Sequence, residues 1–376
     1  MGSSWTFSPR DAGPSEYIEQ SPALQMPYEI PLYANAVYYP NWRVYGKQPP
    51  SSLRLGFVSH ILYSFAWVKP DGTIYLSDEW ADERMPVDGA EGCLRAFVQL
   101  KQQYSTMKVL LSIGGGGKGS ENFSSVAHDS EKVEKFVQSA KDLADQFGLD
   151  GFDINWEHPT NTQEGHDYVC LLSRLRQQFP SPHYLLTTAL PAGEWALRNI
   201  NLAWAQTYLD LIHLMTYDFS GPWLPLTGHQ SQLYTPTAPH NDAACISCHS
   251  GVSYTLTQGV PSKKILLGIP VYGRSFPGAS GINQPYEGAG GDEKVFDYRE
   301  LPRPGTKECH DEAVGAAFCV DEQAGFVSYD STRTVREKAR FVSEMKLGGL
   351  FYWHVAADAV GERSLVATGY NTLHDL

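Results

Sequence analysis

The chain has 376 residues and a formal net charge of -13, and 42% of its residues are hydrophobic. That length and apolar content suffice for one large domain with an insertion or for two ordinary domains. The acidic balance disfavours nucleic acid and anionic membranes as main partners, because both would repel the chain. No apolar run approaches the ~20 residues that a membrane-spanning helix needs.

Residues 1–31 have the composition of a poorly ordered N-terminal extension. They contain no basic stretch followed by an apolar one, so the chain as given shows no secretory signal peptide.

Eight short apolar runs, each bounded by polar residues, Gly or Pro, predict buried strands. In chain order they are 34–39, 60–68, 108–115, 151–156, 183–190, 209–217, 264–273 and 348–355. Helical patterns such as those at 130–148 and 165–179 lie between most of them. Strands buried on both faces and alternating with helices predict parallel βα units, and eight such units predict an α/β fold of the closed (β/α)8 TIM-barrel type.

The gap between the seventh and eighth strands is too long for a simple crossover. Its composition predicts a small α+β insertion over residues 276–338. Residues 32–275 and 339–376 then form the barrel.

One strand carries a polar row on a single face. In DGFDINWEHP (150–159), Asp153, Asn155 and Glu157 share one face of the strand, because side chains alternate along it. Phe, Ile and Trp occupy the other face, which argues against an exposed acidic strand. We expect the polar face to carry the chemistry.

Barrels of this kind place their chemistry at the carboxyl ends of the strands. The predicted strand ends carry Tyr38, Trp42, Phe65, Gly114, Gly115, Asn155, Glu157, Met215, Tyr217, Asp218, Arg274 and Trp353. Aromatic rings, carboxylates and one Arg at one mouth suit a neutral, hydroxyl-rich, flat ligand such as a sugar.

Four segments in order resemble the motifs of the family 18 glycoside hydrolases, the chitinases. They are SIGG (112–115), DGFDINWE (150–157), MTYDFSG (215–221) and YWH (352–354). AVYYPNW, KVLLSIGG and KILLGIPVYGRSF resemble the fungal class more closely, and the resemblance runs from about residue 34 to 370. It implies no cofactor.

The resemblance assigns roles to the polar row. Glu157 would be the acid that protonates the glycosidic oxygen and then the base for water, while the substrate's own acetamido carbonyl attacks C1. Tyr217 would hydrogen-bond that carbonyl. The residue at 155 would orient the acetamide N–H and balance the charge on the ring, with Asp153 behind it, within reach for sharing a proton.

At position 155 the chain departs from the family, which has Asp there. The asparagine oxygen can still accept a hydrogen bond, but it carries no negative charge. Loss of one preorganised electrostatic group typically costs ~2.7–4 kcal/mol, or roughly 10²–10³ in rate. We therefore expect a weakened hydrolase, whether the change is engineered or natural.

Other positions are expected to line the substrate pocket by the same resemblance. They are Tyr38, Trp42, Phe65, Gly115, Met215, Asp218, Trp223, Arg274, Glu293 and Trp353, with Trp353 as the hydrophobic floor. Two further departures suggest an altered substrate. Gly116 stands where the family usually has a stacking Trp, and His158 where it commonly has Tyr.

The six cysteines permit disulfides. Cys309 and Cys319 bracket a short acidic loop and are the expected pair, while Cys93 and Cys170 are expected to be buried thiols. Cys245 and Cys248 formally suggest zinc or haem, but their region is a helix without metal in the family, so a local disulfide or two thiols is favoured. We expect no metal.

The leading hypothesis is a retaining chitinase acting on β-1,4-linked N-acetylglucosamine chains, weakened by Asn155. The alternative is a non-catalytic protein that binds chitin oligosaccharides, and an endoglycosidase on N-linked glycans is less favoured. The expected partners are chitin or chito-oligosaccharides, the expected state is a monomer, and an extracellular location is expected although no signal is visible.

Overall fold

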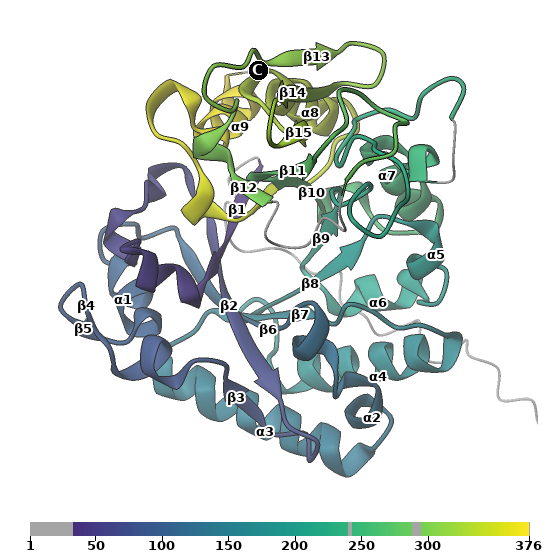
Figure 1. Ribbon diagram of the computed structural model, residues 1–376. Coiled ribbons are helices and arrows are strands. Elements are labelled where there is room, and N and C mark those ends of the chain that lie inside the picture. The colour runs from purple at the N-terminus through teal and green to yellow at the C-terminus, as the bar shows by residue number, and fades with distance from the viewer. Residues whose placement is uncertain (1–32, 240–242, 288–294, 376) are drawn as a thin grey trace, which may run out of the picture.

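The computed structural model describes residues 33–239, 243–287 and 295–375. Eight of its strands pair in parallel and form a closed barrel, because β1 pairs with both β16 and β2 (Figure 1). The barrel strands are β1 (Ala34–Pro40), β2 (His60–Val68), β6 (Lys108–Gly114), β7 (Gly151–Asn155), β8 (Leu185–Pro191), β9 (Leu211–Met215), β10 (Ile265–Pro270) and β16 (Gly349–Trp353). All eight predicted strands and the (β/α)8 fold are confirmed.

Alternate residues of each barrel strand face inward and outward. In β1, Ala36 and Tyr38 belong to the apolar cluster inside the barrel, whereas Val37 and Tyr39 belong to the larger cluster between strands and helices. The strands are therefore buried on both faces, which is why their sequences read as nearly continuous apolar runs.

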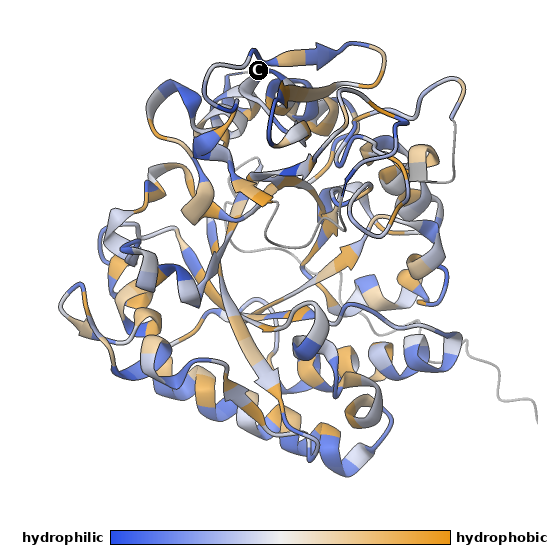
Figure 2. Cartoon of the chain, viewed as in Figure 1, coloured by the Kyte–Doolittle hydropathy of each residue, from blue (hydrophilic) through white to orange (hydrophobic). Residues whose placement is uncertain are grey.

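Helices cover the outside of the ring of strands (Figure 1). They are α1 (Cys93–Leu100), α2 (Phe123–Ala127), α3 (Ser130–Phe147), α4 (Thr162–Gln178), α5 (Glu194–Leu197), α6 (Leu202–Tyr208), α7 (Cys248–Thr257), α8 (Thr332–Glu344) and α9 (Leu365–His374). Hydrophobic and hydrophilic residues alternate along the longer ones, as expected for amphipathic helices (Figure 2). No helix within the described ranges is long and apolar enough to cross a membrane.

The boundaries of α3 follow from its sequence. The Asp129 side chain accepts hydrogen bonds from the N–H groups of Glu131 and Lys132, which caps the first turn. Gly148 ends the helix at φ +70°, a left-handed conformation that glycine adopts without penalty.

Between β10 and α8 the chain forms a small antiparallel sheet of order β12-β11-β15-β14-β13. Its strands are β11 (Tyr272–Phe276), β12 (Val295–Asp297), β13 (Cys309–Asp311), β14 (Ala316–Asp321) and β15 (Gly325–Tyr329). This sheet starts at Tyr272, four residues before the start of the predicted insertion at 276. Helix α8 begins at Thr332, within the range predicted for the insertion, and packs on β10, β16 and α9. β3 (Ile74–Leu76) pairs antiparallel with β2, and β4 (Pro86–Val87) pairs antiparallel with β5 (Ala90–Glu91).

The predicted Cys309–Cys319 disulfide is wrong. β13 and β14 place Cys309 opposite Phe318, so Cys319, one residue further along, points to the opposite face of the sheet. Cys319 is buried and Cys309 is exposed, and no disulfide joins any cysteines of the described segments. Cys93 is buried as predicted, whereas Cys170 lies exposed on α4.

Candidate active site

Strand β7 carries the polar row that the sequence singles out. Asp153 and Asn155 are buried on the inward face, and Glu157 lies two residues beyond the end of the strand, at the mouth of the barrel. Phe152 and Ile154 pack outward, into the core between strands and helices. The predicted division of the two faces is therefore confirmed.

Asp153 lies at the bottom of the site and is completely buried. Its Oδ2 accepts hydrogen bonds from Tyr38 Oη at 2.8 Å and Ser112 Oγ at 2.7 Å. Its Oδ1 accepts one from Thr187 Oγ1 at 2.7 Å and lies 3.2 Å from His213 Nδ1. Burial opposes ionisation of Asp153, but the contacts with His213, Thr187 and Ser112 outweigh it and lower the pKa of this carboxyl.

Asn155 ends β7 opposite Gly114 of β6. Its side chain is buried and lines the cavity above Asp153. No described residue hydrogen-bonds its Oδ1. This acceptor is therefore available to an N–H group of a ligand in the cavity.

Glu157 is held in place through its backbone. Its N–H donates to Ser120 Oγ at 2.8 Å, and the same hydroxyl donates to the Gly115 carbonyl at 2.8 Å. Burial, together with the nearby carboxylate of Asp218, raises the pKa of the Glu157 carboxyl to about 7. A glutamic acid with this pKa can hold a proton near neutral pH and release it during a reaction.

Tyr217 and Met215 come from β9 and the residues just after it, and both line the same cavity as Glu157. Burial raises the pKa of Tyr217, and the Glu157 carboxylate raises it as well. Tyr217 therefore stays a neutral phenol, which can donate a hydrogen bond to a ligand oxygen.

Aromatic rings form the floor of the cavity. Trp353, at the end of β16, stacks on Phe65 with ring centroids 5.6 Å apart and meets Tyr38 edge-on at 5.5 Å. Gly115 makes room for this packing, because a Cβ there would lie 2.8 Å from the Phe65 ring. Such a floor suits the apolar face of a sugar ring.

Asp218 lies on the side of the site next to the small sheet, where Arg274 and Tyr272 of β11 contact it. Arg274 Nε donates to Asp218 Oδ1 at 2.6 Å, and Tyr272 Oη donates to the same oxygen at 2.5 Å. The Arg274 guanidinium lies 4.9 Å from the Trp223 ring centroid, which holds that exposed ring in place.

Two adjoining cavities contain most of the predicted site residues. The smaller, of about 180 Å³, is lined by Tyr38, Phe65, Gly116, Asn155, Glu157, Met215, Tyr217, Asp218 and Trp353. The larger, of about 650 Å³, shares Glu157, Met215, Tyr217 and Asp218 with it and extends to Trp223, His158 and Trp195. The carboxyl of Glu157 thus borders both cavities.

The two departures from the family resemblance lie on opposite parts of this site. Gly116 lines the smaller cavity, and a Cβ there would approach Glu157 Oε2 to 3.3 Å. His158 lies in the larger cavity, where its ring meets Trp195 edge-on with centroids 4.6 Å apart. Trp195, which is 51% exposed, is an aromatic wall that the sequence reading missed.

Four other predicted residues of the described segments line neither cavity: Trp42, Gly115, Asp153 and Arg274. Trp42 lies beside Trp353, with ring centroids 6.4 Å apart, and is 48% exposed. Glu293 lies outside the described residues.

The sequence also did not predict four residues that contact Asp153 or Glu157. They are Ser112, Ser120, Thr187 and His213. Strand alternation could have found three of them, because Ser112 pairs with Asp153, Asp153 pairs with Thr187, and His213 precedes Met215 on the same face of β9. Ser120 ends a short 3-10 helix (Gly117–Ser120), and no strand pattern points to it.

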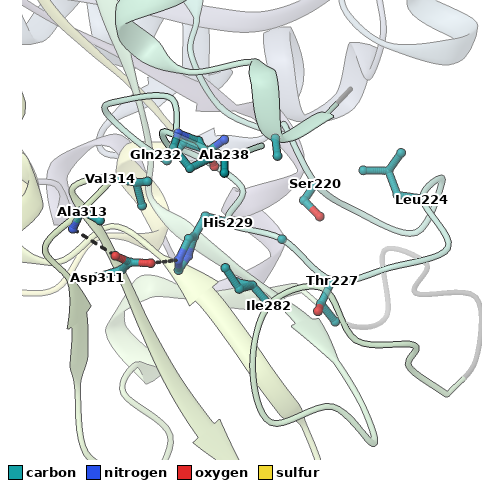
Figure 3. A pocket seen from close by; sticks show the side chains of 13 residues that line it. Ser220, Leu224, Thr227, His229, Gln232, Ala238, Ile282, Asp311, Ala313 and Val314 are labelled. Carbon is teal, nitrogen blue, oxygen red and sulfur yellow. Dashed lines mark hydrogen bonds and ion pairs between the residues drawn. The ribbon is translucent and has the colours of Figure 1, made fainter. Parts of the chain in front are cut away.

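A third cavity, of about 170 Å³, lies between the chain that follows β9 and the small sheet. Figure 3 shows His229 directed at Asp311, whose carboxylate lies 3.3 Å from its Nε2. None of the predicted site residues lines this cavity. No group of three or more His, Cys, Asp or Glu in the segments that the structure describes is placed to hold a metal ion.

A glutamic acid with a raised pKa, set over an aromatic floor at the carboxyl mouth of a (β/α)8 barrel, is the arrangement of a glycoside hydrolase. The pattern of one such family, described as Glycosyl hydrolases family 18, matches residues 34–358. The chain belongs to this family.

Known proteins of similar sequence and structure carry the name chitinase. Chitinase 1 of Aphanocladium album is 35% identical over 364 residues, which cover 91% of this chain and 85% of that protein. The crystal structure of Ostrinia furnacalis Group II chitinase catalytic domain 2 matches with a TM-score of 0.81 at 27% identity, covering 92% of this chain and 97% of that one. An E2180L mutant of that domain, solved in complex with penta-N-acetylchitooctaose, matches with a TM-score of 0.81 at 25% identity over the same shares. These relatives support an enzyme that hydrolyses chitin.

Proposed function

We propose that this chain hydrolyses β-1,4-linked N-acetylglucosamine chains by a retaining, substrate-assisted reaction, and that Asn155 lowers its rate. The observation that carries the proposal is Glu157, which combines a pKa of about 7 with a position on the border of two cavities. The sugar at the cleavage site would lie in the smaller cavity over Trp353, and the leaving-group sugars in the larger one.

The first step breaks the glycosidic bond. Glu157 donates its proton to the bridging oxygen, while the acetamido carbonyl oxygen of the sugar over Trp353 attacks C1 and closes an oxazolinium ring. Tyr217 donates a hydrogen bond to that carbonyl oxygen. In the second step the Glu157 carboxylate takes a proton from water, whose oxygen attacks C1 and reopens the ring. Two displacements at C1 retain the β configuration.

Two functions are expected of the residue at position 155, orientation of the acetamide group and stabilisation of the positive ring, and Asn155 can perform only the first. Its Oδ1 can accept the acetamide N–H and orient the group. Its neutral amide does not stabilise the positive oxazolinium ring, and one such group typically contributes ~2.7–4 kcal/mol, or roughly 10²–10³ in rate. Substrate binding is therefore largely retained while the rate falls.

Aromatic walls on the leaving-group side support an oligosaccharide rather than a small glycoside. Trp195 and Trp223 are both about half exposed and line the larger cavity. With Gly116 in place of a stacking Trp, these two rings would take over the contact with leaving-group sugars. The O. furnacalis domain bound to a chito-oligosaccharide supports the same class of ligand here.

The alternative of a non-catalytic binder rests on Asn155 and Gly116, and the chitinase names of the relatives do not favour it. A monomeric state and an extracellular location remain predictions from the sequence.

The test compares this chain with Asn155→Asp and with Asn155→Asp combined with Glu157→Gln. Cleavage of chitotetraose is measured by chromatography, and binding by calorimetry. The proposal predicts a gain of roughly 10²–10³ in kcat for Asn155→Asp with little change in affinity, and loss of that gain in the double variant. If Asn155→Asp binds chitotetraose and still leaves it intact, the proposal fails and the binder is favoured.

A further inference from the structure

The carboxylate of Asp153 is fully occupied by its neighbours. An ionised carboxylate offers about four lone-pair positions. Tyr38 and Ser112 donate to Oδ2, Thr187 donates to Oδ1, and His213 Nδ1 lies 3.2 Å from Oδ1. Three of these neighbours are hydroxyl groups that act as donors here, so the arrangement fits a carboxylate without a proton.

The contacts of His213 indicate which ring nitrogen carries its hydrogen. Nδ1 lies 3.1 Å from Tyr38 Oη and 3.2 Å from Asp153 Oδ1. Tyr38 uses its hydrogen for Asp153 Oδ2, so a lone pair on Nδ1 would face two oxygen atoms and be repelled. A hydrogen on Nδ1 instead satisfies both oxygens.

Asp153 is turned away from the residue above it. In the described chain no hydrogen bond joins Asp153 to Asn155, although both lie on the inward face of β7. All of the contacts of the Asp153 carboxylate lead to β1, β6, β8 and β9. The Asp153 carboxylate is therefore directed at the neighbouring barrel strands and not at residue 155.

We infer that His213 is a positioning residue that keeps Asp153 ionised and directed at the strands beneath the cavity. Asp153 then supplies, from beneath the sugar, the negative charge that Asn155 lacks. This inference rests on the proposed function. The fixed anion attracts the oxazolinium ring through the buried barrel interior, where charges interact more strongly than in water. Residual activity would then depend on His213 as well as on Glu157.

The titratable groups that interact with Asp153 are Tyr38 on β1, Tyr168 on α4, His213 on β9 and Tyr217 just after β9. Of these, His213 is the one whose ring nitrogen faces Oδ1 of Asp153. Removing its N–H takes away a contact that favours the ionised carboxyl, so the pKa of Asp153 rises in a His213→Leu variant.

The experiment measures kcat/KM on chitotetraose as a function of pH, in the Asn155→Asp background if the parent is too slow. His213→Leu is expected to move the acidic limb up by roughly one pH unit, because Asp153 then takes up a proton at higher pH. His213→Asn, whose amide N–H can still donate, is expected to move it less. His229→Asn is the matched control, since His229 is also buried and its Nε2 contacts Asp311 of the small sheet instead of Asp153. It should leave the limb in place.

If the acidic limb of folded His213→Leu lies at the same pH as in the parent and kcat is lowered equally at every pH, His213 contributes only packing. That result would contradict the inference. Infrared spectroscopy supplies a readout that does not need activity. The carbonyl band of protonated Asp153, assigned as the band missing from Asp153→Asn, should appear at higher pH in His213→Leu than in the parent. Inactivity of Asn155→Asp would contradict the proposed function. An infrared band that appears at the same pH in His213→Leu and in the parent would contradict the role of His213.

Discussion

At the scale of single residues, Glu157 combines two properties that are hard to reconcile in water. It is an acid with a pKa of about 7, and it lies where a ligand can reach it. Burial in the barrel mouth disfavours its charged form, and Asp218 adds a like charge. The arrangement keeps the proton available until a leaving oxygen takes it.

This origin of the pKa predicts a pH dependence. The acid must be protonated, so kcat/KM of this chain should fall as pH rises through about 7. Asp218→Asn removes the like charge, lowers the pKa of Glu157 and should move this alkaline limb to lower pH. Asp311→Asn, in the small sheet and outside both cavities, serves as the control. An alkaline limb unaffected by Asp218→Asn would contradict the account of this pKa.

A second residue-scale prediction concerns the leaving-group side. Trp195→Ala removes an exposed ring from the larger cavity and should raise KM for chitotetraose roughly fivefold, through a loss of about 1 kcal/mol of stacking. Trp204→Ala is the matched control, because Trp204 is 60% exposed on α6 and lines neither cavity. Equal KM values for the two variants would show that Trp195 does not contact the substrate.

At the scale of elements, the turn after β6 decides how the site is packed. Gly115 has φ +90° and touches the Phe65 ring, whereas Gly116 has φ -61° and faces the cavity. The two adjacent glycines therefore serve different purposes. The first gives the floor its shape, and the second leaves space open beside Glu157.

This difference is testable by melting curves. Gly115→Ala places a Cβ against Phe65 in an unfavourable backbone conformation and should destabilise the fold by roughly 1–3 kcal/mol. Gly116→Ala, whose backbone conformation suits any residue, should stay within about 0.5 kcal/mol of the parent. Similar melting temperatures for the two variants would contradict the packing described for Gly115.

Sequence periodicity predicted the barrel because each strand is buried on both faces and reads as one apolar run. It also predicted the face shared by Asp153, Asn155 and Glu157. It could not predict that Trp195 would lie beside His158, since the two belong to different βα units and meet through the path of a loop. The Cys309–Cys319 pairing failed for a related reason, because closeness in sequence says nothing of the face to which a strand residue points.

At the scale of the whole molecule, barrel and small sheet build the site together. The barrel supplies the acid, the floor and the fixed anion Asp153. The small sheet supplies Tyr272 and Arg274, which hold Asp218 beside Glu157. Neither part alone places all of these groups around one cavity.

The absence of disulfides among the described residues gives a prediction for the whole fold. A reductant should leave the melting temperature unchanged, because no cross-link constrains the unfolded chain. Thermal melts with and without dithiothreitol check this. A melting temperature several degrees lower under reducing conditions would reveal a disulfide.

The most direct test of the central claim is the configuration of the first product. Proton NMR can follow chitotetraose cleavage by Asn155→Asp before the anomers equilibrate. Attack by the substrate's acetamido oxygen, with Glu157 as acid and base, predicts a new reducing end in the β form, and no cleavage when the sugar at the cleavage site lacks its acetyl group. An initial α product, or equal cleavage of the deacetylated substrate, would contradict the account.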